Sequence, residues 1–290
     1  MSDVLVRNGF SFNKKYGQNF LQDVKIPRRI AAECTDYAKP DGAERIPARI
    51  LEIGQGAGIL TKELAAVFER VVAVEIDTTL RPVLDETLAG VTNAEVVYGD
   101  IMETDIPALL DARRTLSDGT RLPVTVCANL PYYITTPILM KLIESGYDFD
   151  HITVMVQKEV ASRLTASPGS AEYGAITASI GLHATVKRLF AVPSGCFYPR
   201  PKVDSAVIRL SLHHPPKYTP EQITRASAFI KAAFSVRRKT LVNALTGASY
   251  DKDTVLAILD RSGLAPTLRG ETLSPDAFVS LADKYAELHG

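Results

Sequence analysis

The sequence contains no run of about 18 consecutive apolar residues, the length that a membrane-spanning helix requires. Its first residues include Asp3 and lack the apolar stretch of a secretory signal peptide. We therefore expect a cytoplasmic protein without a membrane partner. Of the 290 residues, 46% are hydrophobic, which is enough for one large domain with an appendage or for two domains.

The chain also lacks an excess of charge of either sign. Lys and Arg together number 33, and so do Asp and Glu, so the formal net charge is zero. Attraction of the whole molecule to nucleic acid is therefore excluded, and any nucleic-acid site must be a local basic cluster. For the oligomeric state, a monomer is the starting expectation.

Cysteine and histidine are scarce. The three cysteines, Cys34, Cys127 and Cys196, are far apart and odd in number. They indicate buried apolar residues in a reducing compartment, and neither a disulfide framework nor a zinc site. The five histidines are scattered, and the adjacent His213 and His214 would point to opposite faces of a strand. We expect no metal site.

What the sequence does contain is an alternation of short apolar strands and helices. The pattern predicts strands over 48–53, 70–76, 94–98, 124–128 and 152–156, with helices over 24–38, 59–68, 80–88, 137–143, 159–166 and 175–183. Such alternation is typical of βαβ units and a parallel sheet. Residues 186–191 and 205–212 alternate as strands and are expected to form an antiparallel pair at the sheet edge. The fold class is therefore α/β, Rossmann-like, with a seven-stranded, mostly parallel sheet.

The first 23 residues are polar and are expected to be irregular. Near the other end, residues 213–220 contain three prolines and are typical of a linker. Helical patterns follow over 221–245, 253–262 and 275–287. We therefore expect a domain over 1–213 and a small C-terminal all-α domain over 214–290.

A glycine-rich loop follows the first of these strands, with the sequence Glu52-Ile53-Gly54-Gln55-Gly56-Ala57-Gly58. Glycines there allow a sharp turn and close approach to a ligand. The next two strands end in Glu75-Ile76-Asp77 and Gly99-Asp100. Acids at successive strand ends suit ribose hydroxyls and an adenine amine, whereas they would repel a pyrophosphate.

A second motif, Asn129-Leu130-Pro131-Tyr132, closes the fourth parallel strand. The exocyclic amine of adenine is a weak nucleophile because its lone pair is delocalised into the ring. The Asn129 side-chain oxygen and a carbonyl before or at Pro131 offer two acceptors for the protons of that amine. Pro131 makes the turn rigid, and the Tyr132 ring can stack on the base.

The glycine loop and acidic strand ends resemble those of class I S-adenosylmethionine-dependent methyltransferases. More of the chain, from residue 16 to 241, resembles the ribosomal RNA adenine dimethyltransferase family. The resemblance rests on the glycine loop and on blocks at 16–21, 129–137, 157–164, 197–205 and 234–241, including Tyr16-Gly17-Gln18-Asn19-Phe20-Leu21, Phe197-Tyr198-Pro199-Arg200-Pro201-Lys202-Val203-Asp204-Ser205 and Phe234-Ser235-Val236-Arg237-Arg238-Lys239-Thr240-Leu241. Gln55 departs from the family, in which many members have Pro.

The resemblance implies transfer of methyl groups from S-adenosylmethionine, leaving S-adenosylhomocysteine, to N6 of two adjacent adenosines in small-subunit (16S) rRNA. The partner would be the precursor of the small ribosomal subunit. The implied cofactor-binding residues are Gln18, Asn19, Leu21, Gly54, Gln55, Gly56, Glu75, Ile76, Asp100, Ile101 and Asn129. The implied catalytic residues are Asn129, Leu130, Pro131, Tyr132 and Phe197, with Phe197 stacking on the second face of the base.

Short basic clusters flank these motifs and are candidates for phosphate contact. They comprise Lys14, Lys15, Arg200, Lys202, Arg237, Arg238 and Lys239. The cluster at 237–239 is the strongest candidate because three adjacent cations stand out in a neutral chain.

Three alternatives remain open on the sequence alone. One is a related methyltransferase of large-subunit rRNA that confers macrolide resistance, although Leu130 and the Val203-Asp204-Ser205 ending match the small-subunit group better. Another is a non-catalytic RNA-binding or assembly factor, against which the intact Asn129-Leu130-Pro131-Tyr132 motif argues. The third is a nicotinamide dehydrogenase, which the glycine spacing and acidic strand ends oppose.

Overall fold

The computed structural model describes residues 2–13, 16–39, 41–111, 122–236 and 238–289. Of the basic residues singled out above, Lys14, Lys15 and Arg237 lie outside this part of the chain. The described residues form two compact units. The first spans Met1–Ala161 and Lys187–Leu212, and the second spans Ser162–Val186 and His213–Gly290.

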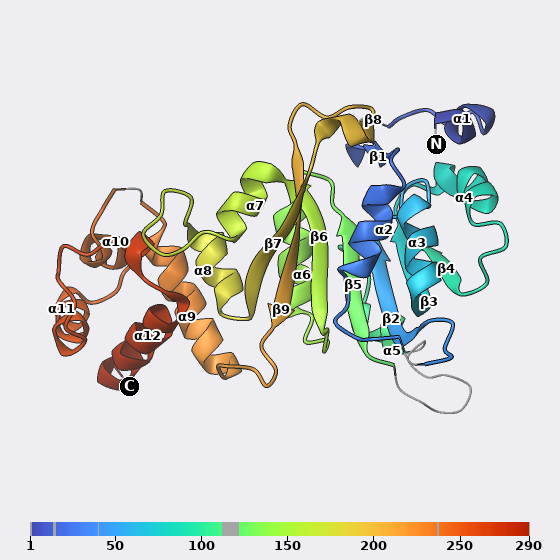
Figure 1. Ribbon diagram of the computed structural model, residues 1–290. Coiled ribbons are helices and arrows are strands. Elements are labelled where there is room, and N and C mark those ends of the chain that lie inside the picture. Colours follow the sequence, from blue (N-terminus) through green and yellow to red (C-terminus); the bar gives the residue numbers. More distant parts are fainter. Residues whose placement is uncertain (1, 14–15, 40, 112–121, 237, 290) are drawn as a thin grey trace. The chain divides into compact units, whose positions relative to one another are not determined.

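The first unit is built on a seven-stranded sheet with the spatial order β4-β3-β2-β5-β6-β9-β7 (Figure 1). The five strands from β4 to β6 pair in parallel, and β9 is antiparallel to β6. The expected mostly parallel seven-stranded sheet is confirmed. The strands are β2 (Ile46–Ile53), β3 (Phe68–Glu75), β4 (Ala94–Tyr98), β5 (Val124–Asn129), β6 (His151–Gln157), β7 (Ala184–Val192) and β9 (Ser205–Leu212).

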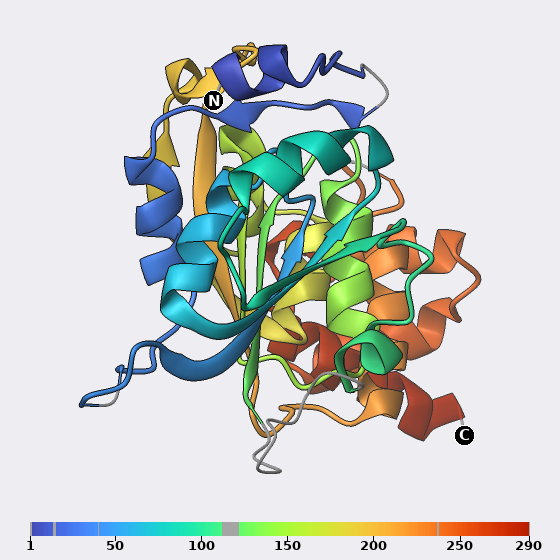
Figure 2. The same cartoon turned by 90° about the vertical axis from the view of Figure 1, so that its right-hand side faces the viewer.

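Helices cover both faces of this sheet. Figures 1 and 2 show α2 (Lys25–Ala32) and α3 (Ile59–Val67) on one face and α6 (Thr135–Glu144) on the other. Because both faces are covered, the central strands are mostly apolar, and β5 is buried at every position before Asn129. The remaining helices of the α/β pattern are α4 (Arg81–Thr87), α5 (Ile106–Asp111) and α7 (Lys158–Leu164), and a 3₁₀ turn, η2 (Thr78–Leu80), precedes α4.

The N-terminal segment is more ordered than its polar sequence predicts. It contains a helix, α1 (Ser2–Arg7), and a short strand, β1 (Phe20–Leu21), which pairs antiparallel with β8 (Phe197–Tyr198). The expectation of an irregular segment was therefore wrong for these residues. The physical reason is apolar packing, because Leu5 and Phe20 are buried in one cluster with residues of η2 and α4.

The second unit is helical, with a single apolar core that includes Phe229, Leu245 and Phe278. Its helices are α8 (Ala175–Gly181), α9 (Pro220–Ala233), α10 (Leu241–Gly247), α11 (Lys252–Arg261) and α12 (Pro275–His289). Residues 162–186 belong to this unit, although they precede the boundary at 213/214 expected from the sequence.

One long helix was expected over 221–245, and the structure has two. The chain leaves α9 after Ala233, and Arg238 adopts a left-handed conformation with φ of 67°. Thr240 then caps α10 by accepting a hydrogen bond from the Asn243 backbone N–H. A side-chain cap of this kind starts a new helix after a break.

Among the described residues, no helix combines the length and apolarity that crossing a membrane would require.

Candidate active site

The Asn129-Leu130-Pro131-Tyr132 turn is held by hydrogen bonds to the N-terminal segment, to β6 and, through Tyr132, to β9. Asn129 Nδ2 donates to the Asn19 carbonyl at 3.3 Å, and the Leu130 N–H donates to the Met155 carbonyl at 3.2 Å. The amide nitrogen of Asn129 donates to the chain itself, and its oxygen Oδ1 is the atom that can accept a hydrogen bond from a ligand. No described residue donates a hydrogen bond to that oxygen.

The carbonyls of Leu130 and Pro131 are the two candidates for the second acceptor of the amine. The Pro131 oxygen already accepts from the Ile134 N–H at 3.2 Å and from the Thr135 hydroxyl at 3.1 Å. A carbonyl oxygen has two lone pairs, so both are used at the start of α6. The Leu130 carbonyl accepts from no described residue and is the better candidate.

Two tyrosines follow the turn and differ in their surroundings. Tyr132 is half-buried, and its hydroxyl shares a 2.9 Å hydrogen bond with the Ser205 hydroxyl at the start of β9, which fixes the ring. Tyr133 is 64% exposed and contributes to the same cavity. An exposed aromatic ring beside a fixed one provides a surface on which bases can stack.

The glycine loop approaches the N-terminal segment closely. Gly56 has φ of 58°, and a Cβ placed there would lie 2.8 Å from the Phe20 ring. Only glycine satisfies both the left-handed backbone and this approach. The loop is tied to β3 because Glu75 Oε2 accepts from the Gly56 N–H at 2.9 Å.

Glu75 is 4% exposed and lies where β3 ends. Its other oxygen, Oε1, accepts from the Asp77 N–H at 2.9 Å. Burial raises the pKa of Glu75, and the hydrogen bonds from the Asp77 and Gly56 N–H groups oppose that rise because they stabilise the carboxylate. The second acid of this strand end, Asp77, accepts a 2.6 Å hydrogen bond from Gln18 Nε2, which anchors the N-terminal segment over the loop.

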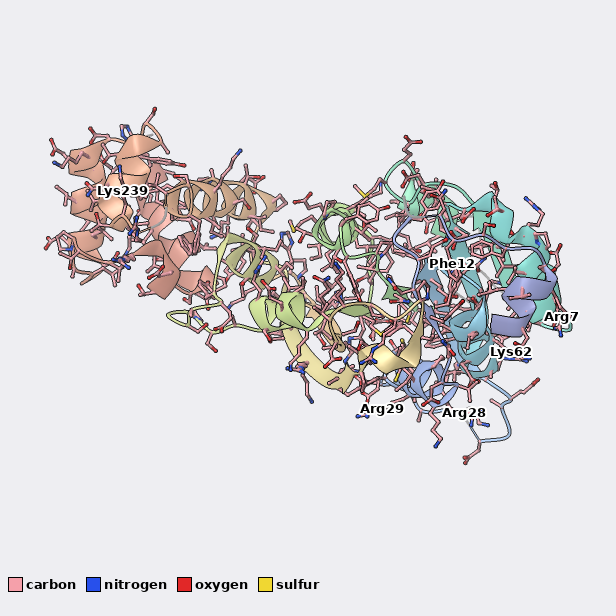
Figure 3. All side chains as sticks on the ribbon, turned by 90° about the horizontal axis from the view of Figure 1, so that it is seen from above. Arg7, Phe12, Arg28, Arg29, Lys62 and Lys239 are labelled. Atoms are coloured by element: carbon pink, nitrogen blue, oxygen red, sulfur yellow. The ribbon has the colours of Figure 1, made fainter. Side chains whose placement is uncertain are left out.

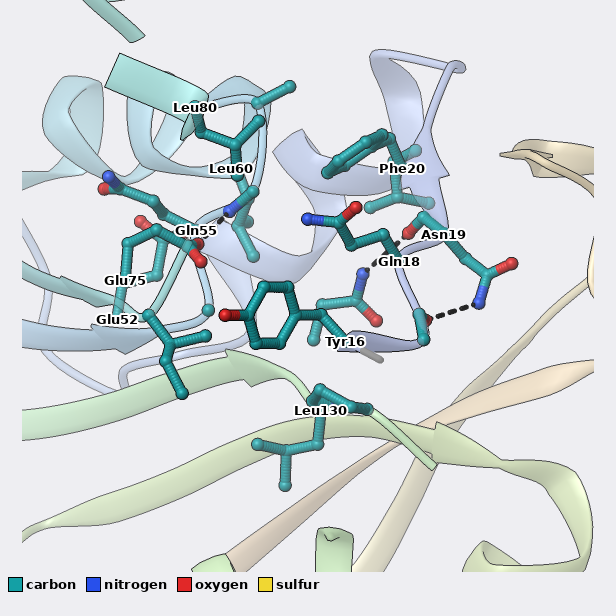
Figure 4. Close-up of a pocket in the computed structure, with 18 of the residues that line it drawn as sticks. Tyr16, Gln18, Asn19, Phe20, Glu52, Gln55, Leu60, Glu75, Leu80 and Leu130 are labelled. Carbon is teal, nitrogen blue, oxygen red and sulfur yellow. Dashed lines mark hydrogen bonds between the residues drawn. The ribbon is translucent and has the colours of Figure 1, made fainter. Parts of the chain in front are cut away.

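These parts enclose one cavity, drawn in Figure 4. Twelve of the expected site residues contribute to its wall: Gln18, Asn19, Leu21, Gly54, Gln55, Gly56, Glu75, Ile76, Asn129, Leu130, Pro131 and Tyr132. The fold therefore brings together expected site residues from three segments that are distant in the sequence.

Three expected site residues are not in the cavity wall. Asp100 follows β4, and its Oδ1 accepts from the Met102 N–H at 2.8 Å, while Ile101 is buried beside it. Phe197 is 3% exposed and packs with Leu21 in the core under α2. Its ring is covered by protein in this structure.

The described members of the basic set are all exposed, and none of them contributes to the cavity wall. Arg200 donates from Nε to the Ser194 hydroxyl at 3.1 Å, and Lys202 is exposed nearby. Arg238 and Lys239 are exposed just before α10 in the helical unit, and Figure 3 labels Lys239 there.

Sequence reasoning missed several residues that the structure places at or near this site. Tyr16 and Phe20 line the cavity, and their place in the Tyr-Gly-Gln-Asn-Phe-Leu block was the available signal. Glu52 lines it as well, although only the glycines beside it were given a role. Figure 3 also labels the exposed cations Arg28 on α2 and Lys62 on α3, which no motif indicated and which do not contribute to the cavity wall.

Within the described ranges, no group of three or more His, Cys, Asp or Glu side chains is arranged to hold a metal ion.

Comparison with known proteins identifies the family. The sequence profile of a family described as Ribosomal RNA adenine dimethylase matches residues 9–287. A ribosomal RNA small subunit methyltransferase A from Shouchella clausii (strain KSM-K16) is 42% identical over 285 residues, which cover 97% of this chain and 92% of the relative.

Solved structures agree with this similarity. The crystal structure of the 23S rRNA methyltransferase ErmE has a TM-score of 0.69 and 26% identity, covering 92% of this chain and 99% of ErmE. A dimethyladenosine transferase from Plasmodium falciparum has a TM-score of 0.73 at 24% identity, with 92% and 98% of the two chains covered, and supports the fold. The chain therefore belongs to the ribosomal RNA adenine dimethylase family.

Proposed function

We propose that this chain transfers methyl groups from S-adenosylmethionine to N6 of two adjacent adenosines in small-subunit (16S) rRNA during ribosome biogenesis, forming dimethyladenosine. The observation that carries the proposal is the orientation of Asn129, whose Nδ2 is held by the Asn19 carbonyl at 3.3 Å. Asn129 lines the cavity that also contains the glycine loop, and its Oδ1 accepts no hydrogen bond from a described residue.

The residues present fit the methyl donor. The Gly56 N–H donates a hydrogen bond to the Glu75 carboxylate at the end of β3. The glycine loop packs so closely against Phe20 that a side chain at position 56 would clash with its ring. Each Glu75 oxygen already accepts one backbone N–H and retains acceptor capacity for a ribose hydroxyl. Asp100 follows the adjacent strand β4 at the same end of the sheet and is proposed to meet the adenine of the donor.

When bound, the donor supplies a methyl group on a positively charged sulfonium, so the chain has to supply positioning and electrostatics. Asn129 Oδ1 and the Leu130 carbonyl would each accept a hydrogen bond from an N–H of N6. These two hydrogen bonds would direct the lone pair of N6 away from the ring. Tyr132 would stack on the flipped base, and its hydroxyl is braced by Ser205. No side chain in this arrangement is needed as a general base, because the proton can leave to water after transfer.

Phe197 is proposed to stack on the second face of the base. Since its ring is 3% exposed and packed with Leu21, this role requires the ring to be uncovered when RNA binds.

The partner proposed is the precursor of the small ribosomal subunit. Residues 1–213 would bind the donor and carry out transfer, and the helical residues 214–290 would contact RNA through Arg238 and Lys239, together with Arg237. Lys14, Lys15, Arg200 and Lys202 would contact phosphates near the catalytic turn. We propose that the protein acts as a monomer in the cytoplasm.

A second candidate substrate is large-subunit rRNA, which the likeness to ErmE at 26% identity favours. The 42% identity to a relative named for the small subunit supports the first candidate more strongly.

The test is transfer of labelled methyl from S-adenosylmethionine to purified small and large ribosomal subunits that lack the modification, followed by nuclease digestion and identification of the nucleoside. We expect N6,N6-dimethyladenosine from the small subunit. Label in the large subunit would support the second candidate, and label in neither would overturn the proposal.

A further inference from the structure

Glu52 is a buried carboxyl group that the proposed reaction does not yet use. It is 1% exposed and lines the cavity, and its oxygens form no hydrogen bond of good geometry with the described residues, although the Thr61 hydroxyl lies nearby. Buried carboxyl groups without partners are rare because desolvation is costly, so each one calls for an explanation.

The sheet register brings Glu52 close to Glu75. Glu52 on β2 is paired with Ala73 on β3, and Glu75 lies two residues further along the same strand. Residues two apart in a strand face the same side, so both acids project from one face of the sheet. Figure 4 shows the two acids at one side of the cavity, with Tyr16 and Leu130 beside them.

The surroundings of the two acids differ. Glu75 accepts two backbone N–H groups, which favour its carboxylate form. Burial raises the pKa of Glu52 to about 8, the nearby Thr61 hydroxyl opposes the rise, and the charge of Glu75 adds to it. An acid pair with such different environments holds one proton, and Glu52 is the member that carries it at neutral pH.

The other titratable groups around Glu52 do not offset this arrangement. Cys127 on β5 is its direct register partner, and the hydrogen bond that the Cys127 thiol makes with Cys34, together with burial, raises the pKa of Cys127, so it stays a neutral thiol. The Tyr16 phenol of the N-terminal segment lines the same cavity, as do the phenols of Tyr132 and Tyr133. None of these groups is a cation.

A cavity with two buried acids and a single proton suits a ligand that brings a positive charge. We propose that Glu52 gives up its proton to solvent when S-adenosylmethionine binds, and that the resulting carboxylate makes the cavity prefer the charged donor over the neutral product. The inference rests on the proposed donor. The O–H bond of Glu52 breaks, the proton passes to buffer, and the new carboxylate is balanced by the sulfonium, a charge that S-adenosylhomocysteine lacks.

Isothermal titration calorimetry on the full chain tests this directly. Donor and product would be titrated separately at pH 6.5 in phosphate and in imidazole buffers, whose ionisation enthalpies differ. We expect about one proton released per donor bound and close to none per product, because a group with a pKa of about 8 is almost fully protonated at that pH. Equal proton release for both ligands would overturn the inference.

Two variants assign the proton. Glu52→Gln keeps the shape but has no proton to lose, and we expect it to abolish the difference between the ligands. Glu63→Gln is the matched control, since Glu63 also lies on the first unit but pairs with Arg28 at the surface. Release that persists in Glu52→Gln would overturn the inference.

A measurement on the unmodified chain covers the case in which Glu52→Gln fails to fold. Between pH 6 and pH 7 the affinity for the donor should rise about tenfold while that for the product stays constant within about twofold. This range lies below the pH at which an α-amino group deprotonates, about 7.7. A constant affinity ratio would overturn the inference. Failure of the donor to bind at all would instead overturn the proposed function.

Discussion

At the scale of single residues, the account depends on how one amide is oriented. Asn129 is held through its nitrogen by a backbone carbonyl that lies 110 residues earlier in the chain. The sequence indicated the Asn129 side-chain oxygen as an acceptor for the amine, but it could not indicate what holds the amide nitrogen, because that is a contact with the N-terminal segment.

Replacing Asn129 with Ala removes the acceptor for N6 while leaving the glycine loop and Glu75 in place. We expect methyl transfer to fall by roughly 100-fold, in line with the loss of one preorganised polar contact at a reacting atom. Binding of the donor should change far less, since most of its proposed contacts are made by the glycine loop, Glu75 and the N-terminal segment. Single-turnover transfer rates and calorimetric donor affinity would be measured in parallel.

Asn243→Ala is the control for that change, because Asn243 is an exposed residue of α10 in the helical unit. It should transfer methyl at the wild-type rate. A wild-type rate in Asn129→Ala as well would remove this amide from the mechanism.

Glu52 also makes the stability of the protein depend on pH. Its pKa is about 8 in the folded chain and near 4.5 when unfolded, so the folded state binds the extra proton between these values. Stability from this group is greatest below about pH 4.5, declines as the pH rises toward 8, and is constant above. Glu52→Gln has no such pH-dependent loss of stability. We expect the free energy of unfolding of the variant, relative to wild type, to be about 2–3 kcal/mol higher at pH 7 than at pH 5.

Chemical denaturation of both proteins at the two pH values measures that gain, with Glu63→Gln as the reference substitution. A gain independent of pH would show that Glu52 ionises normally in the folded chain.

At the scale of elements, the apolar alternation predicted the sheet well because helices cover both of its faces. The strands of the parallel part were recovered to within a few residues. What the sequence could not predict was β1, since two residues pair with β8 across almost 180 positions and carry no local signal. The same pairing buries Phe197, which is why its expected stacking role is not visible in the cavity.

The close approach of β1 to the glycine loop gives a prediction at this scale. Gly56→Ala forces a left-handed residue to carry a Cβ, and that atom meets the Phe20 ring at 2.8 Å. Gly146→Ala has a similar φ, 68° against 58°, but no atom within 4 Å of its added Cβ. It should therefore report the backbone strain alone, about 1–2 kcal/mol.

We expect Gly56→Ala to cost roughly 1–3 kcal/mol beyond Gly146→Ala, because overpacking adds to the strain. It should also weaken donor binding, which Gly146→Ala should not. Equal denaturation midpoints for the two variants would show that the Phe20 ring yields to the extra atom without cost.

At the scale of the whole molecule, a chain of zero net charge has to bind RNA through local cations. The double change Arg238→Ala and Lys239→Ala should weaken binding to small-subunit RNA and reduce the slope of log affinity against log salt by roughly 1–2, as expected when two phosphate contacts are lost. Filter binding across a range of salt concentrations gives the slope.

The control is the double change Lys39→Ala and Arg45→Ala, which alters the net charge by the same amount. These two residues lie just before β2, at the end of the sheet away from the catalytic turn. An unaltered slope in the first pair, or an equal decrease in both pairs, would remove residues 238 and 239 from the RNA surface.

The central claim is that the corner closing β5 faces the methyl donor across one cavity. A crystal structure of the protein with S-adenosylhomocysteine tests this most directly. The account predicts the ligand between the glycine loop and Asn129, with Glu75 on its ribose. Ligand density outside that cavity, or a position that leaves the Asn129 side chain out of reach of the sulfur, would contradict it.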